Sequence, residues 1–337
     1  MPHLLPLKDD SADWRKILQA ATIELDELLL ALELRPEDTG ADHTASADFP
    51  LKVPQPFLRR MQRGDPRDPL LLQVLASRAE HDHVSGFTGD PVGETGAANP
   101  RSGIVHKYRG RVLLIVSSAC AVHCRYCFRR HFPYADNSNS RAEWHAALDY
   151  VRSDSSISEV ILSGGDPLVM GDAQLAELVA QVGAIKHVRR LRIHSRLPVV
   201  IPQRVTTALT DAISHRDLHT IMVIHANHAN EIDASVGEAV ALLRTARITS
   251  LNQAVLLAGV NDSLQAQVDL SETLFGAGVM PYYLHLLDKV AGAAHFDVTE
   301  PDALALHRAM ADSLPGYLLP KLVREVEGAT AKVNRGY

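Results

Sequence analysis

The cysteines of this 337-residue chain are Cys120, Cys124 and Cys127, and they lie in one short run. Their spacing lets a single loop bring three thiolates to one centre. Thiolates of this kind hold iron–sulfur clusters, and a cluster of four irons ordinarily takes four of them. With three, one iron keeps an open position, as catalytic metal sites do. The spacing therefore predicts a [4Fe–4S] cluster bound by these three residues.

Two plainer interpretations of the cysteines compete with the cluster. One is a structural zinc site of three cysteines and one histidine, with His123 or His131 as the fourth ligand. The other is a set of three unrelated buried thiols. Both are less favoured, because structural zinc sites usually draw ligands from two separated knuckles, and unrelated thiols would rarely gather in one short run.

The residues around the cysteines place them at the end of a strand. The run from Arg111 to Ser118 is short and apolar, and it is typical of a buried strand. The cysteines then occupy the loop at its carboxyl end, where α/β barrels carry their chemistry. The sequence SGGDPL at 163–168 follows the next apolar run in the same way. Its glycines let backbone approach a ligand closely, and Asp166 could accept a hydrogen bond from a ligand ammonium.

Alternating apolar and helical segments from residue 111 onward predict an α/β fold with parallel strands and right-handed crossovers. Strands are expected at 111–117, 159–163, 190–194, 220–225, 251–257 and 281–286. Helices are expected between them at 141–153, 172–184, 204–214, 234–247 and 264–276. The pattern alone leaves open whether the sheet is doubly wound or a partial barrel.

The first hundred residues form a helical extension, so we expect two regions, 1–100 and 101–337. Helical periodicity runs through 11–34, and further helices are expected at 56–63 and 68–80. The segment 38–50 is interpreted as a connection, and 81–103, rich in Gly, Asp and Pro, as a loop.

Composition narrows the function classes. The formal net charge is −6 and aromatic residues make up 5%, which argues against a nucleic-acid groove. No apolar run has membrane-spanning length, and the N-terminus lacks the pattern of a signal peptide. Three cysteines do not make a disulfide framework, so we expect a cytoplasmic protein without a membrane or nucleic-acid partner.

The CxxxCxxC motif after the first barrel strand resembles the signature of the radical S-adenosylmethionine (SAM) enzymes. The resemblance implies a partial (β/α)6 TIM-like barrel in which the open iron binds SAM and reduction of the cluster yields a 5'-deoxyadenosyl radical. It also implies that the second-strand motif, formed by Ser163, Gly164, Gly165 and Asp166, contacts the amino group of SAM.

Further segments resemble the lysine 2,3-aminomutase family, which moves an amino group from C2 to C3 of an amino acid with a cluster, SAM and pyridoxal 5'-phosphate (PLP). They lie at 106–112, 124–130, 195–204, 225–231 and 251–262. The resemblance implies Arg129 for the substrate carboxylate, and Asp288 and Glu325 for the side-chain ammonium of lysine. It implies Lys332 as the lysine that carries PLP, Lys107, Tyr108 and Arg111 near the PLP phosphate, and His225 and Gln253 near the adenosyl group of SAM.

Two lysines follow predicted strands and compete for PLP. Lys289 lies beside Asp288, and an ion pair there would keep it protonated and unreactive. Lys332 keeps the spacing from Glu325 that the family shows, although only Gly328 remains of the glycine run that precedes this lysine in longer relatives. Ser263 stands where those relatives place a metal-binding cysteine, so no metal bridge between subunits is expected.

The short form of the chain resembles the bacterial branch that makes (R)-β-lysine for attachment to elongation factor P. That resemblance implies lysine as substrate, an unidentified electron donor, and a functional link to elongation factor P and the enzyme that transfers the lysyl group. Two alternatives stay open: an aminomutase acting on glutamate or arginine, and a non-catalytic metal-binding module. The paired carboxylates Asp288 and Glu325 suit a cationic substrate and would repel glutamate.

Overall fold

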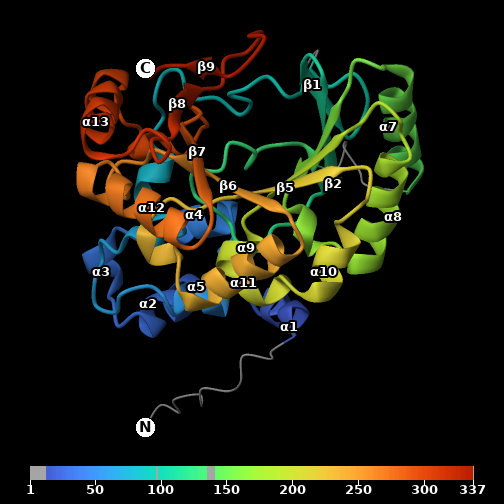
Figure 1. Ribbon diagram of the computed structural model, residues 1–337. Helices are drawn as coiled ribbons and strands as arrows, with labels where there is room; N and C mark the ends of the chain where they lie inside the picture. Colours follow the sequence, from blue (N-terminus) through green and yellow to red (C-terminus); the bar gives the residue numbers. More distant parts are fainter. Residues whose placement is uncertain (1–12, 96–97, 135–140, 337) are drawn as a thin grey trace.

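The computed structural model describes residues 13–95, 98–134 and 141–336 and is built on one nine-stranded sheet (Figure 1). The strands are β1 (Ile104–Tyr108), β2 (Arg111–Ser117), β3 (Glu159–Gly164), β4 (Arg190–Ser195), β5 (His219–Ile224), β6 (Thr249–Val255), β7 (Met280–His285), β8 (Lys321–Arg324) and β9 (Val333–Asn334). They are ordered in the sheet as in the chain, β2 to β8 are parallel, and antiparallel pairings add β1 and β9 at the edges.

This strand order decides between the two topologies that the pattern allowed. A doubly wound sheet reverses its strand order at a switch point, whereas this order runs through without a reversal. The predicted α/β partial barrel is therefore confirmed, and the six expected strands are β2 to β7. The strands β1, β8 and β9 were not expected, because they are short and carry no apolar run like those of β2 to β7.

Helices after the parallel strands cover the outside of the sheet. They are α7 (Arg141–Ser153), α8 (Asp172–Gly183), α9 (Leu197–Val200), α10 (Thr207–Ala212), α11 (Ala234–Thr245), α12 (Leu264–Gly276) and α13 (Glu300–Ser313). In α8 the buried side chains are Leu175, Leu178, Val179 and Val182. This spacing of three and four residues forms one apolar stripe that packs on the sheet, as amphipathic helices do.

The N-terminal region is helical but more broken than expected. It contains α1 (Trp14–Gln19), α2 (Leu25–Ala31), α3 (Pro36–Thr39), α4 (His43–Asp48), α5 (Gln55–Leu58), α6 (Pro69–Leu72) and the 3₁₀ turn η1 (Arg78–His81). The expected helix 11–34 is interrupted where Thr22 makes a bridge to Lys52, and Glu24 caps α2. Within the described ranges, no helix has both the length and the apolar character needed to cross a membrane.

The N-terminal helices lie against the loops at the carboxyl ends of the strands, and Figure 1 shows them in blue beside α9 and α11. Arg60 donates hydrogen bonds to the carbonyl oxygens of Val199, in α9, and of Glu231, in the loop after β5. One hydrophobic core includes side chains from both regions, such as Leu28 and Leu162. The division into 1–100 and 101–337 stays a prediction.

A buried arginine joins this region to the cysteine loop. Arg125 is completely buried, and its Nε and Nη2 donate to the two carboxylate oxygens of Glu80 at 2.8 and 2.6 Å. Its Nη2 also donates to the carbonyl of Ala45 at 3.0 Å, and Arg130 shares Glu80 at 2.8 Å. Because Arg125 lies between Cys124 and Tyr126, this contact fixes the cysteine loop to α4 and η1.

Replacing Arg125 with methionine should lower the free energy of unfolding by about 3 kcal/mol, because Glu80 then keeps only Arg130 and a buried ion pair loses one partner. Urea unfolding of the reduced, cluster-free protein measures this change. The control is Arg152→Met, which breaks an exposed pair with Asp149 and should change the same quantity by less than about 1 kcal/mol. Equal effects in both variants would show that Arg125 does not clamp the loop.

Candidate active site

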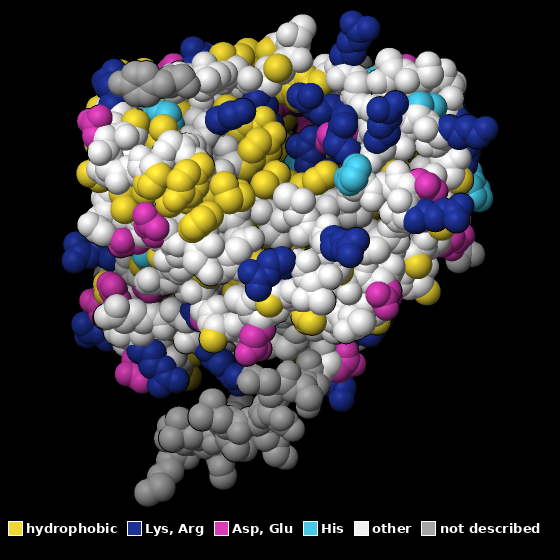
Figure 2. All heavy atoms as spheres, in the orientation of Figure 1, with side chains coloured by type: hydrophobic (Ala, Val, Ile, Leu, Met, Phe, Trp, Pro, Cys, Tyr) yellow, Lys and Arg dark blue, Asp and Glu magenta, His cyan; other side chains and the backbone are white. Residues whose placement is uncertain are grey.

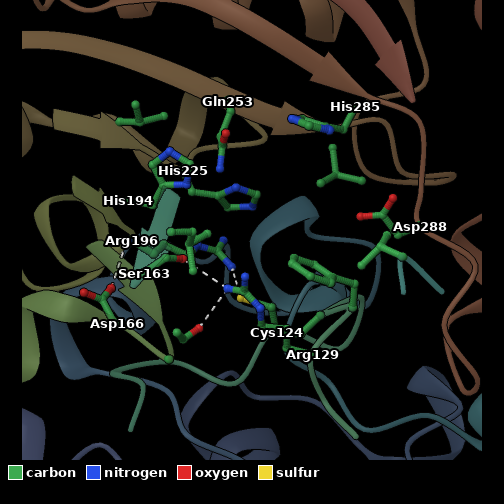
Figure 3. Close-up of a pocket in the computed structure, with 18 of the residues that line it drawn as sticks. Cys124, Arg129, Ser163, Asp166, His194, Arg196, His225, Gln253, His285 and Asp288 are labelled. Atoms are coloured by element: carbon green, nitrogen blue, oxygen red, sulfur yellow. Dashed lines mark hydrogen bonds between the residues drawn. The ribbon is translucent and has the colours of Figure 1, made fainter. Parts of the chain in front are cut away.

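A cavity of about 500 Å³ opens at the carboxyl ends of the parallel strands. The molecule is hollowed near the upper edge of Figure 2, where Lys and Arg side chains gather. Figure 3 shows that the lining side chains come from several neighbouring strands and loops. The residues that the sequence singled out all line this cavity: Lys107, Tyr108, Arg111, Cys120, Cys124, Cys127, Arg129, Ser163, Gly164, Gly165, Asp166, His225, Gln253, Asp288, Glu325 and Lys332.

The three thiols suit a group that carries positive charge. Burial raises the pKa of Cys120, and burial together with the neighbouring Cys124 raises the pKa of Cys127 to about 11. Thiols so placed stay protonated unless metal ions stabilise their thiolates. Of the two histidines of the zinc interpretation, His131 does not line the cavity, and His123 lines it with Nδ1 at 2.8 Å from the carbonyl oxygen of Pro50.

Two glycines press the loop after β3 against the cysteine loop. Gly164 has φ +119°, and a Cβ there would lie 2.4 Å from the carbonyl oxygen of Ser117. A Cβ on Gly165 would lie 2.4 Å from the carbonyl oxygen of Ala119, the residue before Cys120. Only glycine permits this approach. The glycines thus bring the backbone of the second-strand motif directly beside the cluster ligands.

The carboxylate of Asp166 is already filled by protein donors. Its Oδ1 accepts from Ser195 Oγ at 2.7 Å and from the Leu168 amide at 2.9 Å, and its Oδ2 accepts from the amides of Arg196 and Leu197 at 2.8 and 3.2 Å. The structure therefore gives Asp166 the role of holding this loop to the start of α9. A ligand ammonium would meet the backbone of the glycine motif and not this carboxylate.

Arg129 has a buried partner that the sequence analysis missed. Its Nε and Nη2 donate to the carboxylate of Glu94 at 2.7 and 2.9 Å, and its Nη1 donates to Ser163 Oγ at 3.1 Å. Although burial alone would lower it, Glu94 holds the pKa of Arg129 above its usual range. Nothing in the sequence marks Glu94, because it lies in a segment interpreted as plain loop.

A hairpin brings the expected phosphate ligands together. Strands β1 and β2 pair so that Tyr108 lies opposite Arg111, and Gly110 makes the turn at φ +80°. The Arg111 guanidinium lies 4.5 Å from the centre of the Tyr108 ring. Arg192, also missed, lines the same part of the cavity from β4 and pairs with Glu159. These cations make this wall suitable for a phosphate.

Carboxylates and a lysine adjoin this cationic wall. Lys332 Nζ donates to Glu325 Oε2 at 2.7 Å, and the Tyr108 hydroxyl donates to Glu325 Oε1. Burial would raise the pKa of Glu325, but Lys332 brings it below its usual value. Burial raises the pKa of Asp288 to about 7, with Lys332 opposing the rise and Glu325 adding to it. Asp288 is thus half protonated near neutral pH.

The structure corrects one expectation about the competing lysine. Lys289 does not pair with Asp288; its Nζ lies 3.6 Å from Asp297 Oδ2. The side chain is 43% exposed and does not line the cavity, whereas Lys332 does. Lys332 is therefore favoured over Lys289 by its position in the cavity, and not by an ion pair between Lys289 and Asp288.

Three neutral histidines line the middle of the cavity. Burial lowers the pKa of His225 to about 3 and the pKa values of His194 and His285 well below normal. His225 Nε2 lies 2.8 Å from the hydroxyl of Tyr126, which itself belongs to the cysteine loop. His194 and His285 were missed, although each lies on a predicted strand. The alternation of apolar and polar residues along a strand does not show whether an inward-facing side chain lines a cavity or packs in the core.

The fold and these residues define the class of protein: a radical SAM α/β barrel with its cysteine motif after the first parallel strand. A family model described as a 4Fe-4S single cluster domain matches residues 109–193, which include the three cysteines. This match favours the cluster over zinc.

Relatives of known activity match nearly the whole chain. The L-lysine 2,3-aminomutase of Escherichia coli (strain K12) is 47% identical over 98% of this chain and 97% of its own length. That of Haemophilus influenzae is 46% identical over 97% and 96%, and that of Clostridium subterminale is 31% identical over 96% and 77%. The chain belongs to the lysine 2,3-aminomutase family.

Replacing Cys124 with alanine should remove most of the cluster. Only two thiolates would then remain, so a second iron would lack a protein ligand. The visible absorbance and iron content of the anaerobically reconstituted protein measure the loss. Ser118→Ala, in the same segment, is the control and should keep both. A variant that retains full iron and absorbance would remove Cys124 from the ligand set.

Proposed function

We propose that this protein is an L-lysine 2,3-aminomutase that converts L-lysine to (R)-β-lysine. One observation carries the proposal: a single cavity is lined by three thiols, the Lys332 amine, the Arg129 guanidinium, and the carboxylates of Asp288 and Glu325. These groups match a cluster, PLP, the carboxylate of an amino acid and the ammonium of its side chain. The membership in the aminomutase family supports the same conclusion.

Bound together, the cluster, SAM and PLP would supply a hydrogen-abstracting carbon radical and a ring that holds the migrating nitrogen. We propose that Cys120, Cys124 and Cys127 hold the cluster and that Lys332 carries PLP. Lys107, Tyr108, Arg111 and Arg192 would bind the phosphate. The backbone of Ser163, Gly164 and Gly165 would meet the amino group of SAM, and the neutral side chains of His225 and Gln253 its adenosyl group.

The side chain of Lys332 shows how this cavity holds an alkylammonium. Its alkylammonium, the same chemical group that ends the lysine side chain, lies 2.7 Å from Glu325. When Lys332 carries PLP it loses this charge, and Glu325 becomes available for another ammonium. Asp288 is electrostatically coupled to both groups. The two carboxylates are therefore suited to share the substrate ammonium, as we propose.

The carboxylate end is assigned to Arg129. Glu94 engages the Nε edge of its guanidinium, and Ser163 receives a hydrogen bond from Nη1. The guanidinium carries five N–H donors, so Nη2 keeps a second hydrogen for a substrate oxygen. Glu94 and Ser163 fix the plane of the arginine, which orients the bound carboxylate relative to the cluster loop.

The alternatives fit the cavity less well. A glutamate side chain would place a third carboxylate beside Asp288 and Glu325, where like charges in a buried site repel. Arginine carries the right charge, and the cavity walls alone do not reject it. A metal-binding module without PLP would have no use for a lysine amine held on a carboxylate beside a cationic wall.

We also propose that the β-lysine made here modifies elongation factor P, as the short branch of the family implies. The protein would then depend on an electron donor for the cluster and on the enzyme that transfers the lysyl group. Loss of β-lysylated elongation factor P on deletion of the gene, and its return with added β-lysine, would test this link.

Lysine turnover should depend on Asp288 in its ionised form. Since the pKa of Asp288 is about 7, a proton must leave the carboxyl group at lower pH before it binds an ammonium. Affinity for lysine should therefore rise about fivefold from pH 6 to pH 7, and about tenfold in all before it levels off above about pH 8. Asp288→Asn should lose this pH dependence and weaken lysine binding tenfold or more. Anaerobic assays with SAM, PLP and a reductant measure the β-amino acid that is formed from lysine, from glutamate or from arginine.

The control for this assay is Asp297→Asn, which removes a carboxylate outside the cavity. It should keep the wild-type pH profile and lysine affinity. Unchanged lysine kinetics in Asp288→Asn would refute the assignment, and β-glutamate or β-arginine as the main product would refute the proposed substrate.

PLP should be attached to Lys332. Borohydride reduction of the PLP-loaded protein, followed by peptide mass spectrometry, should place the pyridoxyl group there. Lys332→Arg should abolish the modification, whereas Lys289→Arg should keep it. Lys107 is the stronger structural competitor because it also lines the cavity, but its Nζ donates to the carbonyl of Val92 at 2.6 Å. A pyridoxyl group on Lys107 or Lys289 would overturn the assignment.

A further inference from the structure

A buried arginine outside the cysteine loop touches one of the cysteines. Arg196 follows β4 and is 7% exposed. Its Nη1 donates to Cys124 Sγ at 2.7 Å and to the Tyr126 hydroxyl at 2.9 Å. Figure 3 shows the guanidinium reaching Cys124 from the side of Asp166. Arg196 thus places a permanent positive charge and a hydrogen bond on a sulfur assigned to the cluster.

The other side of the guanidinium is held by two buried groups. Nη2 donates to Glu231 Oε2 at 3.0 Å and to Gln73 Oε1 at 2.6 Å. Glu231 and Gln73 are both fully buried. Glu231 also accepts from the Asn227 amide at 2.8 Å and from Gln73 Nε2 at 3.0 Å. Burial alone would raise the pKa of Glu231, but Arg196 keeps it below its usual value, so the pair stays ionised.

These contacts leave Arg196 little freedom to move away from the sulfur. Gln73 and Glu231 come from segments far apart in the chain, the end of α6 and the loop after β5, and each accepts a further buried hydrogen bond from Asn227. The backbone amide of Arg196 is itself bound by Asp166. A charge held this firmly in a largely buried site is screened less than a charge in water.

We propose that Arg196 is a positioning residue that sets the reduction potential of the cluster through the sulfur of Cys124. The inference rests on the cluster assignment made in the proposed function. Reduction adds an electron to the cluster, and a nearby cation with a hydrogen bond to a ligating sulfur stabilises the reduced form. Hydrogen bonds to sulfur and local charge are established determinants of cluster potential. The proposed reaction needs a reducible cluster, and Arg196 makes its reduction easier.

The test is the midpoint potential of the reconstituted cluster, measured by EPR-monitored titration without SAM. Arg196→Gln should shift it to a more negative value by about 59 mV or more, a tenfold change in the equilibrium constant for one electron. Arg196→Lys keeps the charge but cannot span Cys124 and Glu231 with one ammonium, so its shift should be smaller. Arg204→Gln is the matched control, since Arg204 is equally buried but pairs with Asp172, and it should leave the potential unchanged.

A second measurement keeps the proposal testable if the glutamine variant does not load a cluster. Wild-type protein labelled with ¹⁵N in its arginine guanidinium groups should show a hyperfine coupling to the reduced cluster in pulsed EPR. Arg196→Lys should lose that coupling. A loaded glutamine variant with the wild-type potential, or a wild-type protein without the coupling, would overturn the proposal. Wild-type protein that forms no [4Fe–4S] cluster would instead refute the proposed function.

Discussion

The site depends on how buried positive charge is neutralised around one loop without regular secondary structure. Three guanidinium groups lie against the cysteine loop, and removing each from water costs several kcal/mol unless a partner compensates it. Each of them is paired with a buried carboxylate, which Arg125 shares with Arg130, and the three carboxylates come from different segments of the chain. The pairs are Arg125 with Glu80, Arg129 with Glu94, and Arg196 with Glu231.

These pairs connect the loop to parts of the fold that are distant in sequence. Glu80 belongs to η1 in the N-terminal region, Glu94 precedes β1, and Glu231 follows β5. The carboxyl ends of the parallel strands meet at one end of the barrel, and these segments surround the cysteine loop there. The N-terminal region therefore does more than extend the barrel, since it supplies one of the three counter-charges.

The sequence predicted the part of this arrangement that is local in the chain. The cysteine spacing, the glycines at 164–165 and the apolar runs of β2 to β7 are short-range patterns, and each followed from a few neighbouring residues. Glu94, Glu231 and Gln73 carry no such pattern, because their partners lie 35 to 158 positions away. For Asp166 the sequence motif could be recognised, but the role of the side chain could not be predicted from it. Its motif was visible, but only the folded chain reveals that Ser195 and three amides fill its carboxylate.

The last segment shows how backbone pairing can replace a sequence motif. Longer relatives approach PLP with a run of glycines, of which this chain keeps only Gly328. Here β8 and β9 form an antiparallel pair in which Arg324 lies opposite Val333. The next residues outward, Glu325 and Lys332, must therefore face each other across the turn, and they meet at 2.7 Å. Gly328 has φ +76° in the turn between them. A single glycine is enough, because the register of the hairpin and not a flexible run delivers the lysine to the cavity.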